Sequence, residues 1–144
     1  MNKKAVNANT YRGIKIGSVY FFEKKISRKD VIDFARLTGD FNPLHVDRKF
    51  GARSGFKNNI VHGMFAGSLF SKLIGMYCPS KNNLYLSQTL NFKNPVFPGD
   101  VVLVKGTVIN KNDSIRVIIL KTEIFVKGRI AVSGEAKVGM FKYG

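Results

Sequence analysis

The stretch from Met64 to Cys78 constrains the fold more than any other part of the chain. Its large apolar side chains recur at i, i+4 and i+5, at Phe65, Leu69, Phe70, Leu73, Ile74 and Tyr77. This spacing predicts a helix with one broad buried stripe, which Pro79 closes. Gly67, Ser68 and Gly75 are small, so another element could pack closely on it. Because this is the most hydrophobic helix expected, we place it in the centre of the fold.

Strands are expected on both sides of this helix. Residues 18–26 precede it and are rich in β-branched and aromatic residues. After it, turn signals separate four strand-like runs, at 83–94, 101–108, 115–126 and 130–141. In the first of these runs Leu84, Leu86, Leu90 and Phe92 fall on one face with Gln88. A hydrophobic helix followed by a four-strand antiparallel meander predicts an α+β fold with a curved sheet wrapped around the helix.

The N-terminal third carries two further local signals. Residues 1–16 are polar and basic, and we expect them to form a loose arm. Ser27 and Asp30 form a shortened capping box for a helix that Gly39 ends. Residues 47–55 are expected to be a short polar helix or turn.

Length and composition favour one domain, spanning residues 1–144. Cys78 is the only cysteine, which excludes an internal disulfide and favours a reducing compartment. No apolar run reaches the roughly 18 residues of a membrane span, and the first residues lack a secretion signal. We therefore expect a cytoplasmic protein with no membrane contact.

The net charge of +15 raises the question of nucleic-acid binding. The basic residues are scattered from Lys3 to Lys142, however, and no window gathers five or six of them. No helix-turn-helix, zinc-finger or RNP-type motif is present. We expect no specific nucleic-acid partner. The charge suits an anionic ligand or an acidic partner protein.

The segment from Thr38 to Ser71 holds both histidines and the polar groups suited to catalysis. Asp40 and His45 stand five residues apart across a bend, and Asn42 before Pro43 restricts the direction of that bend. Further on, the run Ile60-Val-His-Gly-Met64 brings a glycine to the start of the central helix. A carboxylate, an imidazole and a helix-start N–H are suited to acid–base chemistry on a carbonyl compound.

These residues resemble the signature of the MaoC-like, R-specific enoyl-CoA hydratases. The matching motifs are Asp40-x-Asn-Pro-x-His45, Ile60-Val-His-Gly-Met64 and Phe92-x-x-Pro-Val-x-x-Gly-Asp100, and the likeness covers residues 18–140. The resemblance implies the hotdog fold, with Asp40 and His45 as catalytic residues. It further implies that the Gly63 N–H faces the thioester oxygen and that Ser71 supports the aspartate. We expect Asn42 to support the site through the bend.

The implied reaction is reversible hydration of trans-2-enoyl thioesters to R-3-hydroxyacyl thioesters. It needs no cofactor or metal, the thioester being carried by coenzyme A or acyl carrier protein, and the family resemblance implies at least a homodimer. The alternatives are a hotdog acyl-thioester hydrolase, a carrier-protein-linked dehydratase of fatty-acid synthesis, and a non-enzymatic binding module. His62 is expected to cap or pack and not to react. A zinc site is not expected from two separated histidines and no cysteine cluster.

Overall fold

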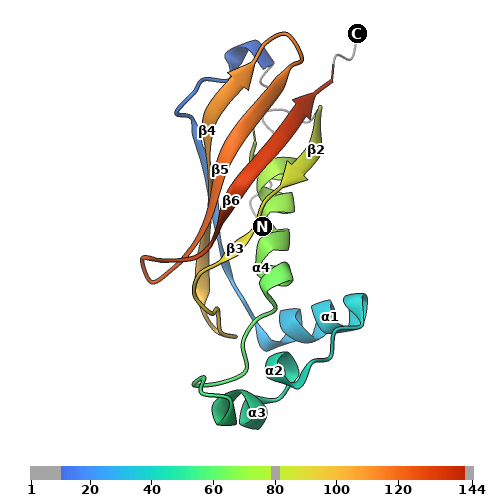
Figure 1. Cartoon of the computed structure of the whole chain (residues 1–144), viewed down its shortest axis with the longest axis vertical. Coiled ribbons are helices and arrows are strands. Elements are labelled where there is room, and N and C mark those ends of the chain that lie inside the picture. Colours follow the sequence, from blue (N-terminus) through green and yellow to red (C-terminus); the bar gives the residue numbers. More distant parts are fainter. Residues whose placement is uncertain (1–10, 79–81, 142–144) are drawn as a thin grey trace.

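The computed structural model describes residues 11–78 and 82–141, and its main element is one antiparallel sheet. The strands lie in the order β1-β4-β5-β6-β2, and the short β3 also pairs with β6. Their bounds are β1 Val19–Lys25, β2 Asn83–Gln88, β3 Asn91–Phe92, β4 Val101–Asn112, β5 Val117–Val126 and β6 Arg129–Met140. The sheet curves along the central helix (Figure 1), which confirms the expected α+β fold.

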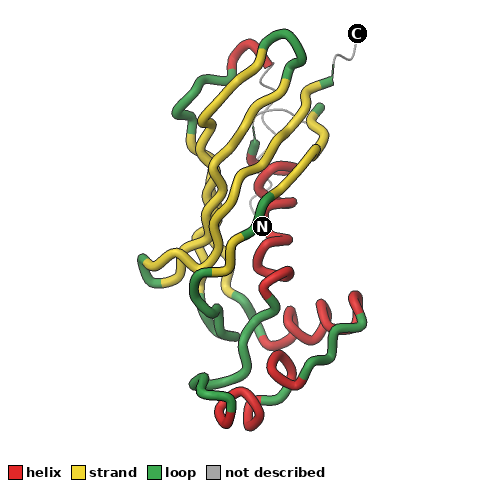
Figure 2. The backbone as a smooth tube through the Cα atoms, viewed as in Figure 1, coloured by secondary structure: helices red, strands yellow, loops and turns green. Residues whose placement is uncertain are grey.

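The helices follow the sequence pattern closely. They are η1 Tyr11–Gly13, α1 Arg28–Thr38, α2 Pro43–Val46, α3 Arg48–Arg53, α4 Gly63–Lys72 and η2 Leu73–Tyr77. The central helix comprises α4 and η2. Its last five residues, which make up η2, form π-helical turns. Pro79, expected to end it, lies outside the described residues. Figure 2 shows α1, α2 and α3 gathered beyond the N-terminal end of α4, where the candidate site lies.

The core lies between the central helix and the sheet. Phe70, Leu73 and Ile74 are fully buried there. A Cβ on Gly106 of β4 would come within 2.9 Å of Leu73 Cδ2, so that glycine lets the helix approach the sheet. Gly67 does pack closely, as expected, since a Cβ there would lie 2.8 Å from Leu90 Cδ1.

The expected four-strand meander is wrong in its first strand. β4, β5 and β6 follow one another, but β2 lies beyond β6 at the edge of the sheet. The run 83–94 also breaks into β2 and β3, since residues 89 and 90 belong to neither strand. Within β2, the register against β6 shifts between Tyr85 and Ser87. Of the apolar residues expected on one face, Leu84, Leu86 and Phe92 are about half exposed in the single chain, whereas Leu90 packs against the core.

Part of the expected N-terminal arm is packed against the core. Tyr11 and Ile14 are buried in a cluster with Ile74 and Cys78, so residues 11–16 are not a loose arm. Residues 1–10 lie outside the described part of the chain. None of the described helices is long and apolar enough to cross a membrane.

Candidate active site

The expected helix caps position the first catalytic candidate. Ser27 and Asp30 form the full capping box of α1, and Gly39 ends that helix in the left-handed conformation with φ of 80°. The chain leaves α1 directly into Asp40. The Asp40 N–H donates to Thr38 Oγ1 at 3.3 Å, and the Asn42 N–H donates to Asp40 Oδ1 at 3.2 Å. The carboxylate is thus oriented by its own bend while half of its side-chain surface stays exposed.

His45 is fixed by the segment that precedes α4. Its Nδ1 lies 2.9 Å from the Ile60 carbonyl oxygen. A carbonyl can only accept, so in the neutral imidazole Nδ1 carries the proton and Nε2 keeps its lone pair. The Ile60 N–H donates to the Leu44 carbonyl at 3.0 Å, and the Asn59 side chain donates to the His45 carbonyl. These two hydrogen bonds hold α2, which carries the imidazole, against residues 59–60.

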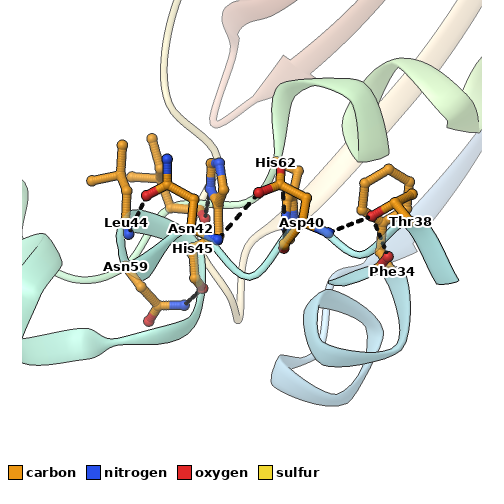
Figure 3. A network of polar contacts seen from close by, with 9 residues as sticks. Phe34, Thr38, Asp40, Asn42, Leu44, His45, Asn59 and His62 are labelled. Carbon is orange, nitrogen blue, oxygen red and sulfur yellow. Dashed lines mark hydrogen bonds and ion pairs between the residues drawn. The ribbon is translucent and has the colours of Figure 1, made fainter. Parts of the chain in front are cut away.

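His62 connects the two candidates. Its ring is 2% exposed and stacks on His45 with centroids 4.0 Å apart. Its Nε2 donates to the Asp40 carbonyl oxygen at 3.0 Å and lies 3.9 Å from the Asp40 carboxylate. Figure 3 shows the three side chains together. The packing role expected for His62 is confirmed, but its side chain makes no helix-capping hydrogen bond.

Gly63 begins α4 directly beside these groups. The first N–H groups of a helix have no intrahelical partner, and the helix dipole makes this end attractive to negative charge. A Cβ on Gly63 would lie 2.9 Å from Cε1 of Phe92. The missing side chain therefore makes room for the ring of Phe92, in addition to the space expected for a thioester.

Asp40, His45, His62 and Gly63 all line one cavity of about 500 Å³. Its apolar walls come from several elements, with Phe56, Ile60, Val61, Met64, Ala66, Phe92, Pro95, Val96 and Val132, and its polar rim from Lys93 and Asn94. A largely apolar cavity with a few convergent polar groups fits an acyl compound with one reactive carbonyl end.

The two supporting residues lie in different places. Asn42 caps α2, its Oδ1 accepting from the Leu44 N–H at 3.0 Å, and its own N–H reaches Asp40. Ser71 stands eight residues after Gly63, roughly 12 Å along the helix at 1.5 Å per residue. It is exposed and is not a cavity residue of this chain.

A metal ion fits this site poorly. The nearest ligand atoms of Asp40, His45 and His62 lie within 4.8 Å of one another. However, His45 Nδ1 and His62 Nε2 already serve backbone carbonyls. His62 Nδ1 is buried without a hydrogen-bond partner among the described residues. Apart from that buried nitrogen, only the carboxylate and His45 Nε2 are left as ligands among these three residues, fewer than the three or four that protein zinc sites use.

Comparison with known proteins shows the family of this chain. A model of the MaoC like domain matches residues 14–127. The chain belongs to the MaoC-like dehydratase family. Within that family, it is 41% identical to an (R)-specific enoyl-CoA hydratase of Aeromonas caviae over 128 residues, 88% of this chain and 96% of that protein. It is 37% identical to a 3-hydroxybutyryl-CoA dehydratase of Methylorubrum extorquens, over 89% of this chain and 82% of that protein.

Solved structures of MaoC-like proteins share the fold. The (R)-hydratase of A. caviae involved in PHA biosynthesis superposes with a TM-score of 0.87 at 40% identity, covering 90% of this chain and 99% of that one. An unliganded R-hydratase of Pseudomonas aeruginosa gives 0.86 at 33% identity, covering 92% and 86%. The expected hotdog fold is confirmed.

Two cavity residues were missed as parts of the site. His62 was expected only to cap or pack, although it contacts both His45 and Asp40. Phe92 was recognised as part of a motif, but its contact with Gly63 joins residues far apart in sequence. Its place in a strand-like run gave no signal of that contact.

Proposed function

We propose that this protein adds water reversibly to trans-2-enoyl thioesters and gives R-3-hydroxyacyl thioesters. The observation that carries the proposal is that the Asp40 carboxylate and the His45 imidazole converge at one largely apolar cavity at the start of α4. Its hydratase relatives support the same hydro-lyase chemistry. Coenzyme A is the carrier that we propose.

The acid–base pair that we propose is Asp40 with His45. A water held between the carboxylate and His45 Nε2 loses one proton to this pair as its oxygen bonds to C3. The C2–C3 double bond becomes a single bond, and C2 takes up a proton from the same pair on the same face. Atoms and charge balance, because the water supplies one hydroxyl and one proton in total. General acid–base help of this kind contributes roughly 10²–10⁴-fold.

The thioester oxygen gains negative charge between these two events. We propose that the Gly63 N–H binds this oxygen, because a helix-start N–H is a preorganised donor with the dipole behind it. Asn42 supports Asp40 through its N–H. A supporting role for Ser71 stays a prediction, since its side chain is exposed in the single chain.

A spectrophotometric assay with crotonyl-CoA tests the proposal. Loss of the enoyl-thioester absorbance, with R-3-hydroxybutyryl-CoA as the product and no metal or redox cofactor added, is the expected result. Release of free coenzyme A at a comparable rate would instead identify a thioester hydrolase.

The same chemistry on acyl carrier protein is the second candidate. A mitochondrial 3-hydroxyacyl-[acyl-carrier-protein] dehydratase of Arabidopsis thaliana is 31% identical over 85% of this chain and 75% of that protein. Parallel assays with crotonyl-CoA and a crotonyl carrier protein decide between carriers by their kcat/KM values.

We also propose that two copies pair in solution. β2 is an edge strand of the sheet, and its Leu84 and Leu86 are about half exposed. Met64 and Met76 add exposed apolar surface on the central helix. An open edge beside apolar surface favours association with a second copy.

A further inference from the structure

A second hollow adjoins the candidate active site and is strongly basic. Lys57, Lys127 and Arg129 stand on its rim, and it shares Asn94 and Pro95 with the catalytic cavity. We propose that this hollow binds the phosphate groups of coenzyme A while the acyl end lies between Asp40 and His45. This inference rests on the proposed function and assigns the part of the site that holds the carrier.

The charge of the hollow is not neutralised. Lys57, Lys127 and Arg129, and Lys93 on the neighbouring cavity rim, form no ion pair with any described acidic residue. Asp100 is the one acidic residue that lines the hollow. Its carboxylate is buried and accepts a hydrogen bond from the Phe97 N–H at 2.9 Å, so it stabilises the turn of residues 97–100. The cationic groups remain available to an anion.

Two of the cations are held in place. Arg129 donates to Asn94 Oδ1 at 3.3 Å, and Asn94 in turn donates to the Ile130 carbonyl at 2.7 Å. Lys57 lies over the ring of Phe97, 4.5 Å from its centroid. Cations with restricted positions lose less entropy when they bind a phosphate. Asn94 thus connects the basic hollow to the catalytic cavity.

Lys127 occupies an unusual backbone position. It forms a two-residue loop with Gly128 between the paired residues Val126 and Arg129, and both loop residues have positive φ, 49° and 77°. Asparagine or aspartate followed by glycine is the favoured pair in such a turn, whereas a lysine there is strained. Strain of this kind often marks a functional position. The lysine supplies the hollow with a charge that asparagine would not.

Another basic hollow does not adjoin the catalytic cavity. Lys25, Arg28 and Arg48 line it, but none of its residues lines the cavity that holds Asp40 and His45. A pantetheine arm starting between the catalytic residues passes Asn94 and Pro95 to reach the hollow of Lys127 and Arg129. The hollow of Lys25 and Arg28 therefore provides a matched control.

Kinetics with whole and truncated substrates test the proposal. The double variant Lys127→Asn/Arg129→Gln removes two charges and gives the turn its favoured residue, and Lys25→Gln/Arg28→Gln removes two charges elsewhere. The measured values are kcat and KM for crotonyl-CoA and for crotonyl-pantetheine, which lacks the phosphates. Hydrogen bonds to charged groups are each worth roughly tenfold in binding.

We expect wild-type protein to show a lower KM for crotonyl-CoA than for crotonyl-pantetheine. The first double variant should raise KM for crotonyl-CoA by about tenfold or more, with kcat and the pantetheine KM unchanged. An unchanged KM for crotonyl-CoA, an equal rise for both substrates, or the same rise in the control variant would overturn the proposal.

A direct binding measurement separates this proposal from the hydratase function. If wild-type protein hydrates neither thioester, the proposed function fails, and calorimetric titration with free coenzyme A still decides the phosphate site. Weaker binding in Lys127→Asn/Arg129→Gln than in the control supports the site. Equal binding in the two variants refutes it.

Discussion

The imidazole of His62 stacks on the imidazole of His45, with ring centroids 4.0 Å apart and 29° between the ring planes. The same buried ring donates from Nε2 to the carbonyl oxygen of Asp40 at 3.0 Å. One residue just before α4 therefore sets the positions of the proposed base and of the carboxylate beside it. Asp40 lies in the short segment after α1, and His45 lies in the four-residue α2, which has no buried residues.

Two substitutions at His62 separate these contacts. His62→Phe keeps a ring to stack on His45 and loses the donor to Asp40, whereas His62→Gln keeps a donor and loses the ring. Because small displacements of catalytic groups cost on the order of 10²-fold, we expect kcat to fall by about that much in each, with KM nearly unchanged. Steady-state kinetics with crotonyl-CoA measure this. Wild-type kcat in both folded variants would exclude the positioning role.

Asp40→Asn and His45→Gln should each lower kcat by roughly 10²–10⁴-fold, the usual contribution of general acid–base catalysis. Both substitutions nearly preserve the size of the side chain and remove its capacity to transfer a proton. Circular dichroism should show an unchanged fold. Near-wild-type turnover in either variant would refute its assignment.

Gly63→Ala should lower kcat/KM on the order of 10²-fold, because the new Cβ displaces Phe92 and disturbs the start of α4. The added atom would stand 2.9 Å from Cε1 and 3.0 Å from Cδ1 of that ring. The double variant Gly63→Ala/Phe92→Leu relieves the clash and should recover part of the activity. If the double variant is no better than Gly63→Ala, the ring is not the cause of the loss.

Light scattering should show a species of at least twice the 16.1 kDa chain mass. Leu84→Lys and Leu86→Lys place charges on the exposed face of β2 and should shift the protein towards monomer. Lys137→Glu on the neighbouring strand is a control that leaves the apolar side chains in place. A single-chain mass for the wild-type protein at working concentration would contradict the proposed pairing.

The capping box of α1 should make stability depend on acid pH. Burial raises the pKa of Asp30, but the Ser27 N–H and hydroxyl and the Lys24 ammonium outweigh it and hold the pKa below its ordinary 3.8. The stabilisation is therefore present above about pH 4 and is lost as pH falls through the lower folded value.

Denaturant unfolding measured from pH 7 to pH 2 checks this dependence. Asp30→Asn should flatten the acid part of the stability curve, and Ser27→Ala should cost about 1 kcal/mol at pH 7. An acid limb of the same steepness in Asp30→Asn would show that other carboxylates cause it.

Local signals in the sequence determined most of the elements. Ser27, Asp30 and Gly39 set both ends of α1 through contacts within a few residues, and the apolar spacing after Met64 marked the central helix. The motif around Asp40 and His45 is equally local, since five residues and a proline set its bend. Such features depend on residues that are neighbours in the chain, and these neighbours can be read directly from the sequence.

Tertiary structure alone decided the pairing of β2 and the connections across the site. β2 pairs with β6 rather than with the next strand in the chain, because strand order depends on long-range hydrogen bonding that alternation does not encode. The contacts of His62 with Asp40, and of Phe92 with Gly63, join residues 22 and 29 positions apart. The sequence pointed to the proposed reacting groups, but only the packing of α1 and α2 against the start of α4 brings them to one cavity.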